Sequence, residues 1–267
     1  YQNHSNVFIH LFIQALGDSV SSIKFLRDKP PIESIKIGKS SLNIFFEEIM
    51  PQRESKYEAE VALRSKSGIQ LSHTPTSSLN ELTSINAGNS WLETFPSYVH
   101  SDQPKAWDVF TFKFFGMNHI QNQSLCPITS NLINSIPELI SCDFSRMKPH
   151  THIKPHKGYS RMILRGHLPL IVAPGNDCGI QVGTDIELHQ KGKMLIFDDS
   201  YEHSAWNHST EDRIVLMFDI ANPLWGYTPD EICKYKIEHI EDPFLLQIAS
   251  KTEWAKAYAN GCLPFNA

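Results

Sequence analysis

Short apolar runs alternate with clusters of turn-forming residues between positions 143 and 219. Three of these clusters are Pro174 to Asp177, Val182 to Asp185 and Asn207 to Asp212. Strands bounded this closely by Gly, Pro, Asn and Asp are typical of antiparallel sheets. The pattern therefore predicts a mainly β protein, built as an antiparallel sandwich or barrel.

The flanking sequence predicts a further strand and several helices. β-Branched and aromatic residues favour a strand from Trp107 to Phe115, and apolar residues at helical spacing favour a helix from Pro127 to Ile140. A hydroxyl cap at Thr228, followed by Pro229 and two acidic residues, is typical of a helix start. We expect the tail after this point to be helical.

A stretch rich in Ser, Thr, Asn and Pro, Ser72 to Ser90, marks a soft boundary. We therefore expect three parts. Residues 1–85 form an N-terminal extension that packs on the core or precedes it, residues 86–225 form the β core, and residues 226–267 form a helical C-terminal tail.

The segment from Ser160 to Val172 is predicted to be a strand with one apolar face. With a period of two, Arg165 and His167 lie side by side on the other face. Such a pair fits a solvated outer face, and it fits equally an anion site in the mouth of a barrel, where a guanidinium can bind a carboxylate through two hydrogen bonds. Spacing alone favours neither interpretation.

A hairpin is predicted over Ser204 to Phe218, with its turn centred on His208. This register places His203 directly across from Arg213, with Cβ atoms roughly 5 Å apart. Two cations so close would repel each other, unless the imidazole is neutral and ligates a metal while the guanidinium binds an anion.

Composition excludes several classes of protein. The 267 residues include 24 Lys and Arg against 29 Asp and Glu, a net charge of −5. Nucleic-acid-binding proteins usually carry a basic excess, so we expect no nucleic-acid partner. The apolar stretch Val7 to Leu16 is too short and too polar for a membrane span, which needs about 20 residues. We expect no integral membrane segment and no signal peptide.

The five cysteines are odd in number and contain no C-x-x-C pair. A secreted disulfide framework usually has an even number, so we expect reduced thiols in a cytoplasmic protein.

Two motifs together carry a family resemblance: Pro155-His156-Lys-Gly-Tyr-Ser-Arg-Met-Ile-Leu-Arg165-Gly-His167, and Phe197-Asp-Asp-Ser-Tyr-Glu-His203 with Arg213 ten residues later. They resemble the aspartyl/asparaginyl β-hydroxylase family from about Trp107 to Trp225, including Cys126-Pro127 and Phe144-Ser145. The resemblance implies a double-stranded β-helix, a jelly-roll or cupin-like core with flanking helices. It also implies an iron(II)- and 2-oxoglutarate-dependent dioxygenase, which uses O2 and releases succinate and CO2.

The resemblance also implies roles for six residues. His156 and His203 would be the catalytic iron ligands. Ser145 and Arg213 would bind the distal carboxylate of 2-oxoglutarate, and Arg165 and His167 its C1 carboxylate. The usual iron triad adds a carboxylate two residues after the first histidine, a position that is Gly158 here. The resemblance therefore implies a site with two histidines and no protein carboxylate, as in the animal members.

The substrate stays open between an Asp/Asn-type residue, an amino acid and another small molecule with an unactivated C–H bond. Animal members that hydroxylate proteins carry an arginine where this chain has Ile163, which argues against an acidic side chain as substrate. Arg161 points to the same face of the predicted strand and is the candidate substitute.

Other polar residues near these motifs have simpler explanations than metal binding. His150 and His152 form an H-x-H-x-x-x-H string with His156, but loop hydrogen bonding explains them better. Asp198 and Asp199 more simply stabilise the turn before His203. A halogenase with a glycine in the carboxylate position is a minor alternative. The main alternative is a non-enzymatic β-barrel that binds a metal or an anion and uses its extensions to bind a partner.

Overall fold

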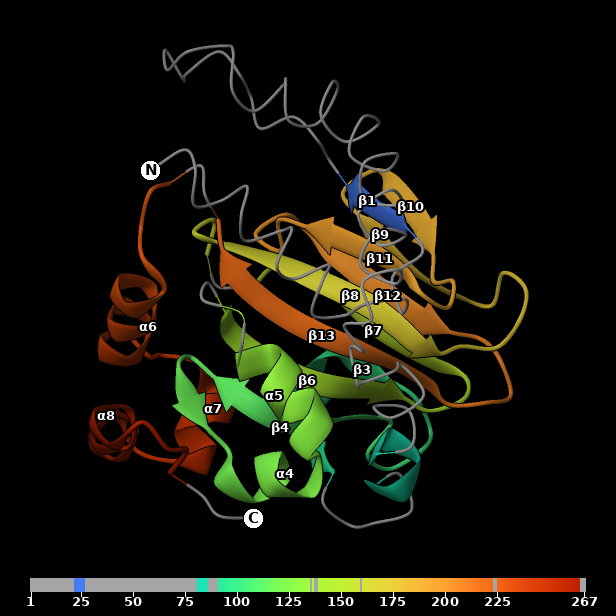
Figure 1. Cartoon of the computed structure of the whole chain (residues 1–267). Helices are drawn as coiled ribbons and strands as arrows, with labels where there is room; N and C mark the ends of the chain where they lie inside the picture. The colour runs from blue at the N-terminus through green and yellow to red at the C-terminus, as the bar shows by residue number, and fades with distance from the viewer. Residues whose placement is uncertain are drawn as a thin grey trace, which may run out of the picture.

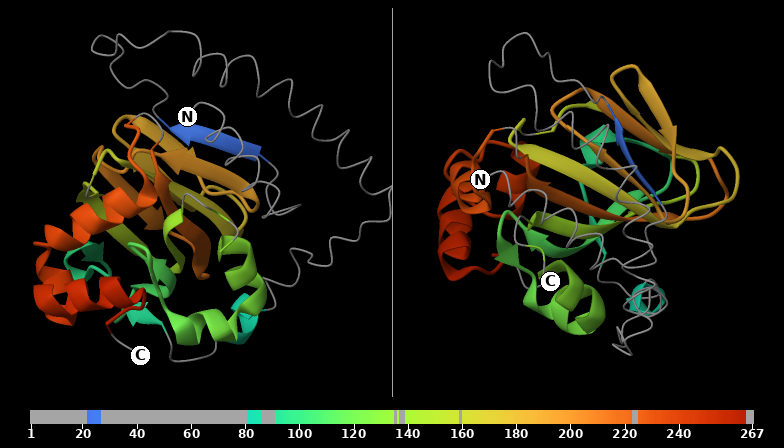
Figure 2. Two further views of the ribbon diagram at one scale, coloured as in Figure 1. Left: turned by 60° about the vertical axis from the view of Figure 1, so that its left-hand side comes forward. Right: turned by 45° about the horizontal axis from the view of Figure 1, so that its top comes forward.

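The computed structural model describes residues 22–26, 81–85, 91–134, 136, 139–158, 160–222 and 225–264. Most of the predicted extension at 1–85 lies outside these residues. Two β-sheets face each other, and helices gather at one end of them (Figures 1 and 2). Among the described residues, no helix is long and apolar enough to span a membrane.

The larger sheet has eight strands in the order β1-β11-β8-β13-β6-β4-β2, with β5 paired to β4. All of its pairs are antiparallel except β1 with β11. Its strands are β1 (Ser22–Leu26), β2 (Leu92–Glu93), β4 (Trp107–Phe114), β5 (Met117–Asn118), β6 (Leu139–Met147), β8 (Ile163–Ile171), β11 (Lys193–Phe197) and β13 (Arg213–Ala221).

The smaller sheet has five antiparallel strands in the order β10-β9-β12-β7-β3. They are β3 (Val99–His100), β7 (Thr151–His156), β9 (Cys178–Val182), β10 (Asp185–Leu188) and β12 (His203–Asn207). From β6 onward the chain passes repeatedly between the two sheets. This arrangement is a double-stranded β-helix, and it confirms the predicted fold class.

The observed helices agree with the predicted ones better at their first residues than at their last residues. Helix α5 (Pro127–Asn134) begins where predicted, but the predicted helix to Ile140 is wrong, because Leu139 already begins β6. The central strand β6 pairs with β4 and β13, and this pairing outweighs the helical spacing. The short helices α4 (Ile120–Leu125) and η4 (Pro96–Tyr98) were not predicted.

The predicted helical tail is confirmed as three helices: α6 (Pro229–Glu238), α7 (Pro243–Ile248) and α8 (Lys251–Asn260). Thr228 and Glu231 form a capping box at α6, as Ser250 and Glu253 do at α8. Gly261 ends α8 with φ 67°, a backbone conformation that glycine adopts without steric cost. The C-terminal helices lie together at one end of the sheets (Figure 1).

The two faces of the larger sheet meet different surroundings. Its outer face packs with α5 into a core that includes Phe110, Phe112, Phe144 and Leu168. Its inner face packs against the smaller sheet through a second cluster that includes Trp107, Met147 and Phe197. Alternation along each strand therefore separates core residues from those that face the space between the sheets.

The predicted hairpin with His203 directly across from Arg213 is wrong. β12 pairs with β7 and β9 in the smaller sheet, and β13 pairs with β6 and β8 in the larger one. The connection between them crosses from one sheet to the other. His203 and Arg213 therefore reach the same cavity from opposite sheets, not from neighbouring strands.

Candidate active site

Two histidines meet where β7 ends and β12 begins. His156 and His203 are Cα partners across these strands, and their ring centroids are 4.2 Å apart. Nδ1 of His156 lies 2.8 Å from the Lys154 carbonyl oxygen, and Nδ1 of His203 lies 2.9 Å from that of Tyr201. If each Nδ1–H donates to its carbonyl, both Nε2 lone pairs are left for a metal ion.

Burial favours the ligating form of both imidazoles. It lowers the pKa of His156, and it lowers the pKa of His203 to about 3 with a smaller contribution from His156. Both rings are therefore neutral at pH 7. Neutral imidazole is the form that binds transition metals.

A β-bulge orients His156. The register between β7 and β12 shifts between His203 and Ala205, so that Ile153 and His156 both reach the space between the sheets. His152 lies on the opposite side of β7, where His208 and His100 contribute to lowering its pKa. The string of three histidines is therefore not a joint metal site.

A small cavity adjoins the two histidines and contains a buried guanidinium. The Arg213 side chain is 1% exposed, and its Nε and Nη1 atoms have no hydrogen-bond partner among the described residues. Its Nη2 contacts the sulfur of Met147. Burial lowers the pKa of Arg213 to about 10. A buried cation without an anion is costly, so this cavity fits an anionic ligand.

Ser145 and His167 line the same small cavity. The Ser145 hydroxyl accepts a hydrogen bond from Trp107 Nε1 at 3.0 Å. Nδ1 of His167 lies 3.4 Å from Nε2 of His189, a buried histidine that the sequence analysis did not identify. All six predicted site residues therefore line this cavity between the sheets.

Arg165 lies on the inward face, while its neighbours Leu164, Leu168 and Leu170 pack in the core. Arg165 therefore faces the space between the sheets and does not lie on a solvated outer face. Arg165 Nε and Nη2 bind the two carboxylate oxygens of Asp219 at 2.8 and 3.0 Å. Asp219 was not predicted, because it lies 54 residues away in the sequence and no local pattern marks it.

Asp199 is a second unpredicted partner of Arg165, at 3.4 Å from Nη2. Its Oδ1 is buried without a hydrogen-bond partner, and burial raises the pKa of Asp199 to about 7. Its backbone oxygen accepts a hydrogen bond from Gly158 N at 2.7 Å. The turn is instead stabilised by Asp198, whose carboxylate accepts from Ser200 N at 2.9 Å.

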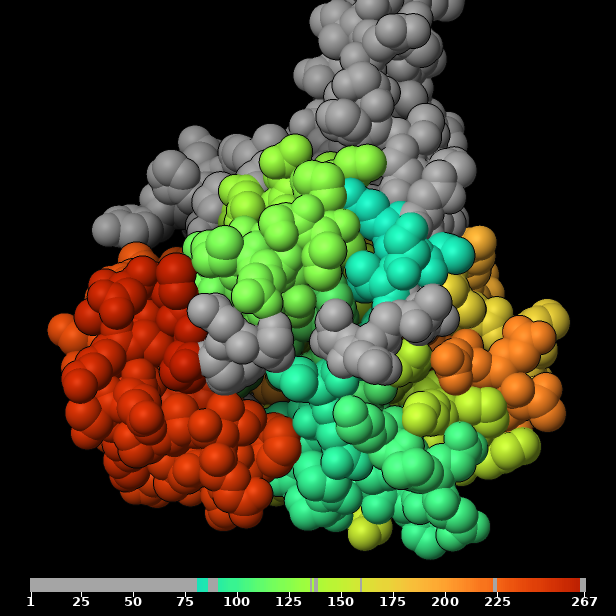
Figure 3. Space-filling model, turned by 90° about the horizontal axis from the view of Figure 1, so that it is seen from below, coloured from blue at the N-terminus to red at the C-terminus, as the bar shows by residue number. Residues whose placement is uncertain are grey.

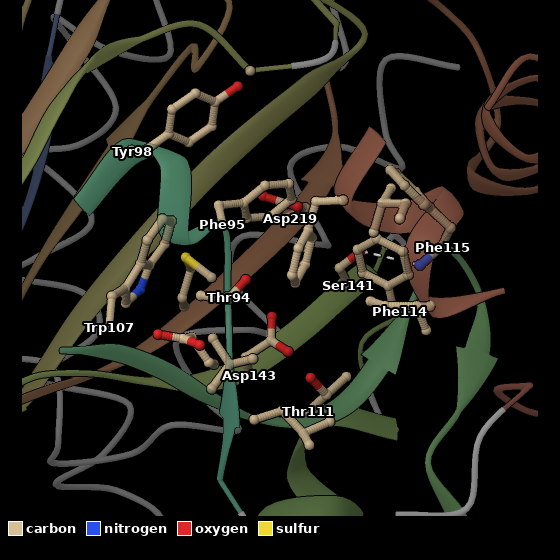
Figure 4. A pocket seen from close by; sticks show the side chains of 18 of the residues that line it. Thr94, Phe95, Tyr98, Trp107, Thr111, Phe114, Phe115, Ser141, Asp143 and Asp219 are labelled. Carbon is tan, nitrogen blue, oxygen red and sulfur yellow. Dashed lines mark hydrogen bonds between the residues drawn. The ribbon is translucent and has the colours of Figure 1, made fainter. Parts of the chain in front are cut away.

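A larger cavity shares Trp107, His156, Arg165 and Met217 with the small one. Its floor on the sheet is polar and includes Thr111, Ser141, Asp143 and Asp219 (Figure 4). Its other walls are mainly apolar, with side chains from Phe95, Tyr98 and the C-terminal helices, and they also include Glu93 and Lys157. Figure 3 shows the C-terminal segment, in red, lying against the segment that begins near residue 91.

Residues 77–223 match the family model described as aspartyl/asparaginyl beta-hydroxylase, which is more than half of the chain. The chain belongs to this family.

Curated hydroxylases are among the relatives of this family member. It is 36% identical over 156 residues to an ornithine lipid ester-linked acyl 2-hydroxylase of Rhizobium tropici, covering 57% of this chain and 55% of that protein. It is 34% identical over 125 residues to the human aspartyl/asparaginyl beta-hydroxylase, covering 44% of this chain and 16% of that protein. The chain thus spans about half of the first relative's length and about a sixth of the second's.

Solved structures that resemble the chain are distant from it. One is the cupin domain of a Schizosaccharomyces pombe protein, 12% identical with a TM-score of 0.28, covering 34% of this chain and 61% of that chain. The fold of this family member is assigned from its own strand order.

Two parts of the site differ from what is usual. One is the set of metal-ligating side chains, and the other is position 163, where an arginine could bind an acidic substrate. Among its described residues, no group of three His, Cys, Asp or Glu side chains is placed to hold a metal ion. Ile163 is buried in the apolar cluster that includes residues of the C-terminal helices. Arg161, the candidate substitute for an arginine at that position, is exposed and does not line either cavity.

Proposed function

We propose that this hydroxylase depends on iron(II) and 2-oxoglutarate. The observation that carries the proposal is the buried guanidinium of Arg213, with two unpartnered nitrogen atoms, in a cavity that also contains two histidines with available Nε2 atoms. When bound, the iron and the keto acid would supply oxidation by O2: one oxygen atom enters a substrate C–H bond, the other enters succinate, and CO2 leaves.

The two histidines fit the metal. Their neutral rings, held by backbone carbonyls, present nitrogen ligands that suit iron(II). We propose that they are its only side-chain ligands, since Gly158 has no side chain. The Asp199 carboxylate lies in the space that a side chain on residue 158 would occupy.

The polar side chains that line the small cavity suit a dicarboxylate. We propose that Arg213 and the Ser145 hydroxyl bind its distal carboxylate, which would supply the anion that the buried guanidinium lacks. His167 and Arg165 would bind the C1 carboxylate at the other end. Since Asp219 engages Nε and Nη2 of Arg165, Nη1 is the atom left for the cosubstrate.

The substrate would occupy the larger cavity, which reaches His156 and is walled mainly by apolar side chains. The named substrates of the relatives differ: one relative is named for a lipid acyl chain and another for aspartyl and asparaginyl residues. The apolar wall favours a substrate with an apolar chain.

Anaerobic titration of 2-oxoglutarate into the protein, with and without iron(II), tests the proposal. We expect binding only with the metal, and slow release of succinate in air without added substrate. Binding of the keto acid without metal dependence, and no succinate, would instead support the non-enzymatic anion-binding barrel.

A further inference from the structure

Asp143 occupies the floor of the larger cavity. It lies on β6, where its Cα partners are Thr111 on β4 and Met217 on β13. All three residues line the cavity, and Asp143 is 7% exposed (Figure 4). Its carboxylate therefore faces any molecule that fills the cavity.

Among the described groups around Asp143, none is a cation that pairs with its carboxylate alone. The Thr111 hydroxyl hydrogen-bonds to it from β4, and Asp219 on β13 adds a like charge. Arg165 on β8 is the nearest guanidinium, but it is paired with Asp219 and lies close to Asp199. Among the described residues, no lysine or arginine forms an ion pair with Asp143.

The proposed cosubstrate would make this imbalance larger. Three carboxylates, those of Asp143, Asp199 and Asp219, already surround Arg165. A carboxylate of 2-oxoglutarate on Arg165 Nη1 would add a fourth negative group beside the same cation. An acidic substrate group would then meet repulsion at the cavity floor, whereas a hydrogen-bond donor would find an acceptor.

The opposite wall is apolar and comes from the C-terminal helices. Phe244, Leu245 and Ile248 of α7 and Trp254 of α8 line the cavity, and the Phe244 ring lies 4.7 Å from that of Phe95. These helices follow the residues that match the family model. The cavity thus has one carboxylate-bearing side and one apolar side, and Lys157 also lines it.

We propose that Asp143 binds a hydrogen-bond donor on the substrate, an ammonium or hydroxyl group, next to an apolar chain that packs on α7 and α8. The substrate class is then a neutral or cationic molecule with an apolar chain, and not an acidic side chain. This inference rests on the proposed function, since it names a substrate class for the same site.

Three ligands with one chain and different end groups test the assignment: octylammonium, octan-1-ol and octanoate. Each is titrated by calorimetry into the full metal-free chain at pH 8. We expect the wild type to bind octylammonium at least about tenfold more tightly than octanoate, the scale of a hydrogen bond to a charged group. In Asp143→Asn the two affinities should differ by less than about threefold.

Glu93→Gln is the matched control, because Glu93 is a more exposed carboxylate that lines the same cavity. Glu93→Gln should keep the preference for octylammonium if Asp143 is responsible. Three outcomes would overturn the proposal: no binding of any octyl compound, equal or tighter binding of octanoate by the wild type, or an unchanged preference in Asp143→Asn.

Failure of the oxygenase proposal would look different. It would appear as no binding of 2-oxoglutarate by the iron-loaded wild type, whereas the octyl series uses neither metal nor keto acid. Asparagine has nearly the shape of aspartate, and a thermal melt of Asp143→Asn establishes that the variant is folded.

Discussion

The carboxylate of Asp199 lies where a side chain on Gly158 would lie. A Cβ atom built on Gly158 would be 2.0 Å from Asp199 Oδ2 and 2.2 Å from its Cγ. A carboxylate from another part of the chain therefore lies against residue 158, the sequence position at which other oxygenases carry their iron-binding carboxylate. Because Gly158 has no side chain, the Asp199 carboxylate can occupy this space.

This relationship reverses a simple expectation for Gly158→Asp. The pattern of an iron triad suggests that the new carboxylate raises metal affinity, but here it collides with Asp199. We expect Gly158→Asp alone to unfold more easily by about 1–3 kcal/mol, the usual cost of overpacking, without tighter iron binding. The double variant Gly158→Asp/Asp199→Ala should recover the room and bind iron more tightly than the wild type. Urea denaturation and metal titration measure both effects, and an undisturbed Gly158→Asp protein would contradict them.

Removal of either histidine should abolish iron binding and leave the fold intact. His156→Ala and His203→Ala each leave one imidazole, while the outer core of the larger sheet does not include either residue. Elemental analysis after iron loading, together with circular dichroism, checks the prediction. His152→Ala is the matched control, since His152 lies on the other side of β7 and should keep full iron occupancy. Full occupancy in a His156 or His203 variant would remove that residue from the site.

Arg213 should have opposite effects on cosubstrate affinity and on stability. Its loss would leave the distal carboxylate of 2-oxoglutarate buried and unpaired, at a cost of about 3–5 kcal/mol, or roughly 10²- to 10⁴-fold in affinity. Arg213→Lys should fall in between, because an ammonium keeps the charge but not the planar fork. The charge-transfer absorbance of anaerobic iron-loaded protein reports the affinity. An Arg213→Ala affinity within threefold of the wild type would contradict the assignment.

Without cosubstrate, however, the same guanidinium is a buried cation with two unpartnered nitrogen atoms. Arg213→Met replaces it by an apolar side chain of similar length. We therefore expect the ligand-free Arg213→Met protein to melt at the same or a higher temperature than the wild type. A markedly lower melting temperature would show that Arg213 has a structural anion partner within the chain.

Asp143 should make stability depend on pH. Burial raises the pKa of Asp143 from 3.8 to about 7, although the Thr111 hydroxyl and Arg165 oppose the shift. The unfolded chain releases this proton at lower pH than the folded one, so folding loses stability as the pH rises from about 4 to about 7. Asp143→Asn removes this loss. Relative to the wild type, the variant should gain up to about 4 kcal/mol at pH 8 and little near pH 4.

Urea denaturation of the wild type and of Asp143→Asn across this pH range measures the difference. Glu93→Gln again provides the control, since Glu93 is a more exposed carboxylate that lines the same cavity. A constant difference between Asp143→Asn and the wild type at every pH would mean that Asp143 is ionised without penalty in the fold.

Local patterns in the sequence determined the strands, the turns and the starts of the helices. The alternation around Arg165 and His167, the capping residues at Thr228 and the Gly- and Asp-rich turns act over a few residues. These local effects on the backbone do not depend on which distant segments pack nearby, so they are the same in any compact fold. For this reason the mainly β fold class and the strand β8 could be predicted without any knowledge of long-range contacts, whereas spacing alone did not decide whether Arg165 and His167 face inward.

Only the tertiary structure decided which sheet each strand joins and which partners the site residues have. The sequence between His203 and Arg213 predicts a hairpin, yet the two strands that it connects belong to different sheets. The bulge that orients His156 and the ion pair between Arg165 and Asp219 likewise depend on strand register, which packing of the whole core fixes. The approach of Asp199 to Gly158 has the same origin, since contacts between distant segments form only once loop closure and burial have brought them together.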